Sequence, residues 1–172
     1  MAIREIIIFT EDTYGVEFFN NLIQMISKRY KTQLKVTLHR LAGKCYPKVN
    51  RQITAACNST KNGIVLIIAD AEGENVQSVE RFLLRYVPKT CPIPVRLLIF
   101  QYMIEEWICV GLSIKYSSDL IRRLDEYLRN MRGPNYKYKK RILPDFVERL
   151  DMNKLEQHSL FVKFLNILLD RD

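Results

Sequence analysis

Residues 62–73, with the sequence Asn-Gly-Ile-Val-Leu-Ile-Ile-Ala-Asp-Ala-Glu-Gly, contain the clearest strand pattern of the chain. The Asn62-Gly63 pair is a turn signal, and the aliphatic run that follows it is typical of a strand buried on both faces of a sheet. The acidic and glycine residues at 70–73 then end this strand. A strand of this kind predicts a parallel sheet that is covered by helices on both sides.

The sequence on either side of this strand alternates between strand and helix patterns. Further strands are expected at residues 6–9, 34–38 and 95–100. Helices are expected between them, over residues 16–26 and 75–86 and, from a weaker pattern, over 49–58. We therefore predict an α/β fold, a Rossmann-like and mostly parallel sheet of about four strands with helices on both faces.

The character of the sequence changes after Trp107. Residues 117–132 have the pattern of a basic helix that ends at Gly133-Pro134, residues 135–141 form a polar basic segment, and a last helix is expected over 153–169. We predict two parts. Residues 1–112 form the α/β domain, and residues 113–172 form a basic, mostly helical C-terminal extension packed on the same domain. The length of 172 residues suits one compact domain with such an addition.

Composition limits the classes of protein to which the chain can belong. Hydrophobic residues make up 48% and charged residues 27%, a balance typical of globular proteins and not of disordered chains. No apolar run reaches the roughly 20 residues of a membrane-spanning helix. Acidic residues follow the N-terminal apolar stretch at once, which favours a buried strand over a secretory signal.

The cysteines show no pattern of a metal site. Cys45, Cys57, Cys91 and Cys109 include no Cys-x-x-Cys pair, and no His stands at ligand spacing from them. Without a secretory signal, we expect reduced thiols and a cytoplasmic protein.

Acidic residues follow three of the expected strands. Glu11 comes after the first, Asp70 and Glu72 after the third, and Glu105 and Glu106 shortly after the fourth. Right-handed crossovers bring the carboxyl ends of parallel strands to one edge, where α/β proteins bind ligands. Carboxylates gathered there repel one another unless a cation lies among them, and their oxygens suit Mg²⁺ or Mn²⁺. Asp70 and Glu72 alternate by two, so an extended segment would point both side chains the same way.

The alternative is that these acids only cap the helices that follow the strands. A carboxylate at a helix N-terminus accepts hydrogen bonds from backbone N–H groups that have no partner within the helix. The residues themselves leave both interpretations open.

Two short motifs carry a resemblance to a known family. Phe9-Thr10-Glu11-Asp12 places a Glu after the first strand, and Asp70-Ala71-Glu72 places an Asp-x-acid motif after the third. This order resembles the Toprim domain of topoisomerases, DnaG-type primases and OLD-family nucleases, in which a Glu follows the first strand and Asp-x-Asp follows the third. Glu72 stands here in place of the second Asp, which keeps the charge and lengthens one ligand arm.

The chain is more closely similar to the small stand-alone Toprim-like proteins of bacteria and archaea. After the second strand they often carry His-x-Gly-Lys, where this chain has the longer segment His39–Lys44. After the fourth strand they carry Glu-x-Trp, here Glu105-Glu106-Trp107. Near the C-terminus they have an Asp-x-x-x-Leu helix and a Ser-Phe-like turn, to which Asp151–Leu155 and Ser159–Phe161 are similar.

The resemblance implies a metal-dependent nuclease. Glu11, Asp70 and Glu72 would hold one or two Mg²⁺ or Mn²⁺ ions, and Glu105 would join them as a catalytic residue while an activated water cleaves the phosphodiester. No nucleophilic side chain is needed, and no Ser-His-Asp or Cys-His arrangement stands out. The alternative is a Toprim-like module without catalytic activity that binds nucleic acid or a partner protein. The sequence has no GxxxxGK[ST] motif, so an ATPase partner would be a separate protein.

Positive charge is concentrated in one stretch of the chain. The net charge is +8, and residues 113–141 hold nine basic and three acidic residues. Such an asymmetry predicts a surface that meets the phosphates of a nucleic acid, and the alternative is an ordinary solvated face. The candidate contacts are Lys44, Arg122, Arg123, Arg129, Arg132, Lys137, Lys139, Lys140 and Arg141.

Aromatic residues accompany both the acids and the cations. Phe100, Tyr102 and Trp107 lie near the acids, where they either stack on a base or pack in the core. In the segment 136–141 tyrosines alternate with cations, a pattern of either a stacking contact with nucleic acid or a flexible solvated loop.

Overall fold

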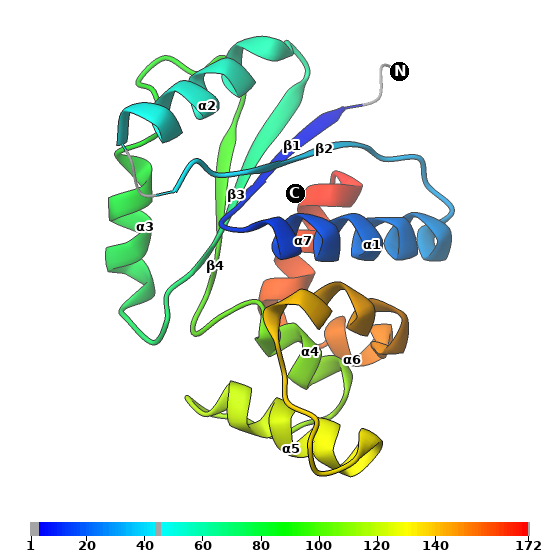
Figure 1. Ribbon diagram of the computed structural model, residues 1–172. Helices are drawn as coiled ribbons and strands as arrows, with labels where there is room; N and C mark the ends of the chain where they lie inside the picture. Colours follow the sequence, from blue (N-terminus) through cyan, green and yellow to red (C-terminus); the bar gives the residue numbers. More distant parts are fainter. Residues whose placement is uncertain (1–3, 44–45, 172) are drawn as a thin grey trace.

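The computed structural model describes residues 4–43 and 46–171 and has an α/β architecture (Figure 1). Its strands are β1 (Glu5–Thr10), β2 (Lys35–Arg40), β3 (Gly63–Asp70) and β4 (Val95–Phe100). They form one sheet in the order β2-β1-β3-β4, and every neighbouring pair is parallel. The predicted parallel sheet is therefore confirmed, with β3 buried along almost its whole length.

Helices cover both faces of this sheet. The helices of the described chain are α1 (Thr13–Tyr30), α2 (Tyr46–Ser59), α3 (Val76–Leu84), α4 (Glu105–Gly111), α5 (Leu120–Arg132), the 3₁₀ helix η1 (Lys140–Arg149), α6 (Met152–Leu155) and α7 (Ser159–Leu169). In β1, Ile6 and Ile8 pack into the core that contains α1 and α7, whereas Ile7 and Phe9 pack into the core that contains α2 and α3. This alternation explains the continuous apolar run, because both faces of the strand are buried.

Trp107 lies at the centre of the larger core. It is fully buried, and its ring meets those of Phe19, Phe100, Phe161 and Phe164 at centroid distances of 4.8 to 5.9 Å. Phe100 and Trp107 are therefore core residues and not a base-stacking platform. Through these rings, α4 is fixed to the sheet and to α7, so the start of α4 has a defined position beside the end of β4.

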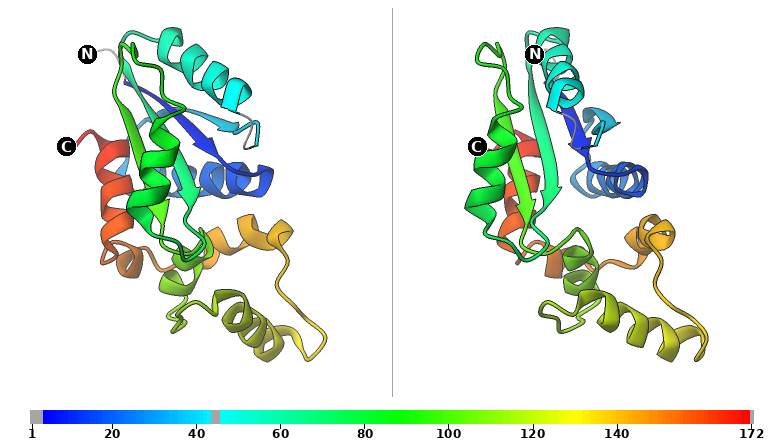
Figure 2. Two further views of the ribbon diagram at one scale, coloured as in Figure 1. Left: turned by 90° about the vertical axis from the view of Figure 1, so that its left-hand side faces the viewer. Right: turned by 60° about the vertical axis from the view of Figure 1, so that its left-hand side comes forward.

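The C-terminal part packs against the carboxyl end of the sheet and one of its faces (Figure 2). The expectation of one helix over residues 153–169 is wrong, because a turn after Leu155 separates α6 from α7. The short helix α6 packs on α4, and α7 packs on β4. One straight helix could not contact both, so the chain breaks between them.

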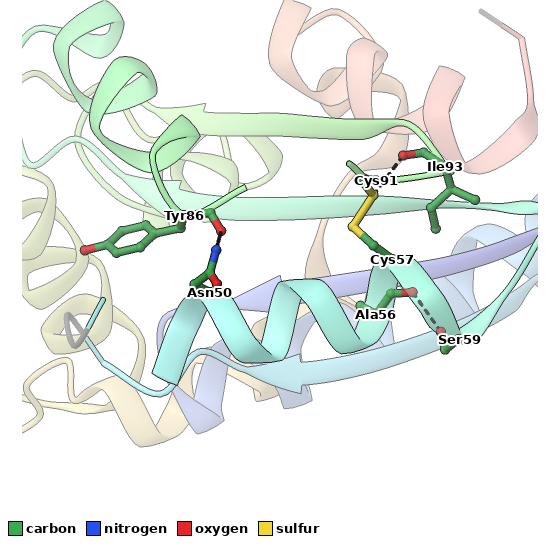
Figure 3. Close-up of a disulfide and its surroundings, with 7 residues drawn as sticks. All are labelled: Asn50, Ala56, Cys57, Ser59, Tyr86, Cys91 and Ile93. Carbon is green, nitrogen blue, oxygen red and sulfur yellow. Dashed lines mark hydrogen bonds between the residues drawn. A yellow bond between two sulfur atoms is a disulfide. The ribbon is translucent and has the colours of Figure 1, made fainter. Parts of the chain in front are cut away.

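A disulfide joins Cys57 to Cys91 at the amino end of the sheet (Figure 3). The expectation of reduced thiols is therefore wrong for this pair, whereas Cys109 is a buried free cysteine and Cys45 lies outside the described residues. The two partners are 34 residues apart, so no short motif marks them. They meet because Cys57 precedes β3, Cys91 precedes β4, and these strands are parallel neighbours.

Membrane insertion of a helix finds no support in the described part of the chain. None of its helices combines the length and the apolar character that a crossing of the bilayer requires.

Candidate functional site

The candidate site lies at the carboxyl end of the sheet, at the point where the strand order reverses. The chain goes from β1 outward to β2 and then returns to β3 on the other side of β1, so the carboxyl ends of β1 and β3 form the switch point. A cavity of about 20 Å³ at this position is lined by Glu11, Asp12, Asp70, Ile104 and Lys140, among others. It has room for roughly one water molecule.

Asp70 is the most perturbed carboxyl group at this edge. Burial raises its pKa, and the neighbouring charges of Glu11 and Glu105 raise it further. Lys140 and the backbone N–H of Ile104, which donates to Asp70 Oδ1 at 3.0 Å, act in the opposite direction. The resulting pKa is about 8, so near neutral pH this carboxyl group carries a proton for much of the time.

Glu105 is buried, at 1% exposure, and two side chains satisfy its carboxylate. The Tyr138 hydroxyl donates to Oε1 at 2.7 Å, and Lys140 Nζ lies 3.2 Å from Oε1 and 3.3 Å from Oε2. Lys140 Nζ is also 3.6 Å from Asp12 Oδ2. Burial alone would lower the pKa of Lys140, but the attraction of Glu105, Asp70 and Asp12 outweighs it and raises the pKa. The ammonium group is thus a counter-charge shared by several carboxylates.

Three of the four predicted catalytic residues come together here. Glu11 and Asp70 line the same small cavity, and Glu105 is joined to it through Lys140. We call Glu11, Asp70 and Glu105 the carboxyl-edge cluster. Their convergence follows from strand ends that share one edge of a parallel sheet.

Glu72 lies apart from the carboxyl-edge cluster. Its backbone has φ of +50°, its side chain is exposed, and it lines a different cavity of about 280 Å³ together with Tyr102 and Arg122. The expectation that Asp70 and Glu72 point the same way along an extended segment is therefore wrong. Backbone hydrogen bonds from Glu72 and Gly73 to the loop after β4 hold this turn in place.

The N-caps of α1 and α3 are residues near Glu11 and Glu72, not these two acids themselves. Asp12 is the N-cap of α1, and its Oδ1 accepts a hydrogen bond from the backbone N–H of Gly15 at 2.6 Å. Asn75 caps α3 in the same way through Ser78. Asp12 therefore has two roles, since its other carboxylate oxygen faces Lys140.

Glu106 has a structural role beside the cluster. It is buried, accepts a hydrogen bond from the backbone N–H of Tyr102 at 2.5 Å, and lies 3.5 Å from the Tyr116 hydroxyl. Burial and the charge of Glu106 raise the pKa of Tyr116 to about 12, so this hydroxyl stays a donor. Through its contacts with Tyr102 and Tyr116, Glu106 fixes the loop that leads from β4 to Glu105.

The basic helix is largely neutralised by its own acids. Arg122 and Arg123 both pair with Asp119 and Glu126, with Arg123 Nε 3.0 Å from Asp119 Oδ2. Arg129 Nη2 lies 3.8 Å from Asp125 Oδ2. The guanidinium group of Arg122 and the backbone of Ser117 hold the pKa of Asp119 well below its usual range. Asp119, Asp125 and Glu126 are the three acidic residues between positions 113 and 141, so each of them pairs with arginines of this helix.

Inward and outward side chains alternate from Lys137 to Arg141, whereas Tyr136 before them is exposed. Tyr138 is buried and Lys140 is half-buried against the cluster, whereas Lys137, Lys139 and Arg141 are exposed. The predicted cationic segment thus divides into an inward side and an outward side. This alternation was visible in the sequence and could have marked Tyr138, which the sequence analysis did not single out. Two predicted contacts remain. Arg132 is exposed, with its guanidinium carbon 5.9 Å from the centroid of the Tyr136 ring, and Lys44 lies outside the described residues.

Within residues 4–43 and 46–171, no three His, Cys, Asp or Glu side chains are already arranged to hold a metal ion. Comparison of the chain with protein-family models, with curated proteins and with solved structures found no match. The geometry of the site itself therefore carries the functional argument.

Proposed function

We propose that the carboxyl-edge cluster binds a divalent cation and that the protein cleaves phosphodiesters of nucleic acid with it. One observation carries this proposal: acids that follow three parallel strands lie together at the switch point, where the ammonium group of Lys140 is the counter-charge of Glu105 and Asp70. Switch points at the carboxyl ends of strands are where α/β folds bind ligands.

The donor chemistry of the cluster fits Mg²⁺ or Mn²⁺. Its side chains offer only carboxylate oxygens, which these ions prefer. A full ligand set requires Lys140 to withdraw and the side chains to turn inward, since the present arrangement places Lys140 among them. Glu72 is not part of the proposed ligand set, because its side chain belongs to the neighbouring cavity.

In this proposal, the metal ion, the buried carboxyl groups and the exposed cations have separate roles. A bound divalent cation would supply Lewis-acid polarisation of the phosphodiester and activation of a water molecule. Asp70 is held in position by the Ile104 N–H, and Glu105 by the Tyr138 hydroxyl. Lys137, Lys139 and Arg141 form an outward cationic row close to this edge, which would attract the phosphate backbone.

A second candidate is a module that binds nucleic acid or a partner protein without catalysis. The lack of a preformed ligand set in the described residues favours it, together with a lysine that already neutralises the acids. An ATPase partner, which this sequence does not contain, belongs to either candidate as a separate protein.

Cleavage assays separate the two candidates. We expect the wild-type protein to cleave a labelled DNA duplex, a DNA single strand or an RNA when Mg²⁺ or Mn²⁺ is added, and to stop when EDTA is added. Glu11→Gln should lower the cleavage rate at least roughly 100-fold, because it removes one ligand charge. The matched control is Glu17→Gln, which changes an exposed glutamate of α1, the helix that follows Glu11. This variant should retain the cleavage rate. Binding of the three substrates without any metal-dependent cleavage would favour the second candidate.

A separate prediction concerns the contribution of the outward cationic row to nucleic acid binding. Replacing Lys137, Lys139 and Arg141 by Gln should weaken binding about equally for different duplex sequences. The log–log slope of affinity against salt should become shallower by about 2 to 3, at roughly 0.9 for each lost phosphate contact. A control variant replaces Lys28, Lys31 and Lys61, which are exposed at the opposite edge of the sheet, and should keep the slope. Equal slopes for both triple variants would show that the row is an ordinary solvated face.

A further inference from the structure

The cavity at the carboxyl-edge cluster is too small for a phosphodiester. Its volume of about 20 Å³ is close to that of one water molecule, and Lys140 forms part of its wall. Glu11 is exposed, but Glu105 is buried and Asp70 is half-buried. A nucleic acid backbone therefore reaches these two carboxyl groups only if a covering segment moves. The segment that covers them is residues 134–140, which we call the strap.

The strap is held by the ring of Tyr138, which is buried in the larger core 6.2 Å from the ring of Phe146, and by a few polar contacts. The backbone N–H of Tyr138 donates to Asp125 Oδ1 at 2.6 Å, its hydroxyl donates to Glu105, and Lys140 pairs with Glu105 and Asp12. Residues 134–137 and Lys139 are exposed. Figure 2 shows the segment between α5 and η1 as an extended chain at the side of the molecule.

A residue with conformational freedom, Gly133, directly precedes the strap. Gly133 has φ of +110°, a region that glycine enters without a steric penalty, and a side chain there would meet nothing within 4 Å. At the other end, the strap continues directly into η1, which packs on α1. Lys140 is both the last residue of the strap and the first residue of η1. The strap can therefore swing about Gly133 and the junction at Lys140 while the rest of η1 keeps its place on the core.

We propose that the strap is a gate over the carboxyl-edge cluster and that Lys140 is the internal cation that keeps it closed. This inference rests on the proposed function, because it takes the cluster to bind a divalent cation. Lys140 and the divalent cation compete for Glu105 and Asp70, two of the three members of the cluster. Without either of them, Glu105 would be a buried charge with no cation beside it, which is strongly unfavourable. The gate therefore opens when a divalent cation replaces Lys140, and it exposes the site when the metal is in place.

The outer side of the strap fits the same scheme. Lys137 and Lys139 point away from the cluster and are available to phosphates. When Lys140 leaves the cluster, it adds a third cation to this segment. A nucleic acid backbone would then hold the opened strap, so binding of metal and of nucleic acid favour the same state.

Hydrogen exchange followed by NMR tests the gate without any measurement of activity. The wild-type protein, Lys140→Met and the outward control Lys139→Met are compared with and without Mg²⁺, and calorimetry measures Mg²⁺ binding by each. In wild type, saturating Mg²⁺ should speed exchange of the Tyr138 amide about tenfold or more, while amides of β3 stay unchanged. Lys140→Met should exchange fast at this amide without Mg²⁺ and bind Mg²⁺ about tenfold more tightly. Lys139→Met should behave as wild type.

Two further results would overturn the gate in distinguishable ways. If calorimetry detects Mg²⁺ bound to wild type and the Tyr138 amide exchanges at an unchanged rate, the gate is wrong and the metal site stands. If neither wild type nor Lys140→Met binds Mg²⁺, the proposed function and the gate fail together. Tyr138→Phe, which removes only the hydroxyl donor to Glu105, is a second variant in case Lys140→Met does not fold. It should also speed exchange of the strap, and an unchanged rate would contradict the closing contacts described above.

Discussion

An Asp70→Asn variant should be more stable than the wild-type protein by about 2–5 kcal/mol at pH 9, with almost no difference at pH 4. In the wild type, burial and the neighbouring carboxylates raise the pKa of Asp70 from 3.8 to about 8. The folded protein therefore keeps a proton that the unfolded chain has lost. Wild-type stability falls as the pH rises from about 4 to about 8, and this loss levels off above pH 8. Asn stays neutral in both states and can still accept the hydrogen bond from the Ile104 N–H.

Thermal melts in EDTA between pH 4 and pH 9 check this result. The melting temperature of Asp70→Asn should exceed that of wild type by roughly 5–15 °C at pH 9, and the two curves should converge toward pH 4. Asp145→Asn, at an exposed position, is the matched control and should follow wild type throughout. A variant that is less stable than wild type at pH 9 would show that Asp70 contributes mainly as an ionised hydrogen-bond acceptor. The same variant should have lost metal-dependent cleavage, which separates a functional carboxylate from a structural one.

Loss of the disulfide is expected to lower the free energy of unfolding by about 3–4 kcal/mol, as the loop-entropy relation gives for a closed loop of 34 residues. The bond ties the last part of α2 to the segment before β4. Near the start of α2, the Asn50 side chain donates a second link, a hydrogen bond of 2.9 Å to the Tyr86 carbonyl just after α3 (Figure 3). Without the disulfide, only packing and hydrogen bonds hold α2 to its neighbours.

Urea unfolding with and without dithiothreitol measures this contribution. Cys57→Ala/Cys91→Ala should be less stable than oxidised wild type, and the reductant should destabilise wild type while leaving the double variant unchanged. Because the disulfide lies at the amino end of the sheet, Mg²⁺ binding at the opposite end should be the same in both proteins. An oxidised wild type with the stability of the double variant would contradict the expected contribution.

The sheet could be predicted from the sequence because its signals are local. The aliphatic runs of β1 and β3 alternate between two cores, so each strand reads as apolar along its whole length. The convergence of Glu11 and Asp70 also followed, since parallel strands share their carboxyl edge. Both inferences need only the order of the elements.

The remaining features depend on contacts between distant residues or on a single backbone angle. Tyr138 and Lys140 reach Glu105 across 33 and 35 residues, and the disulfide spans 34. Glu72 leaves the cluster because its own φ is positive, which a two-residue alternation does not reveal. The charge count of residues 113–141 could not show that the acids of α5 pair with its arginines.

Anomalous scattering from crystals soaked in Mn²⁺ would locate a metal ion at the carboxyl-edge cluster. We expect a manganese peak bounded by the carboxylates of Glu11, Asp70 and Glu105, with Lys140 Nζ moved away from its 3.2 Å contact with Glu105. Crystals of Asp70→Asn soaked in the same way should lack this peak. A structure at high Mn²⁺ in which Lys140 still bonds Glu105 and no metal lies among these carboxylates would show that the cluster is not a metal site.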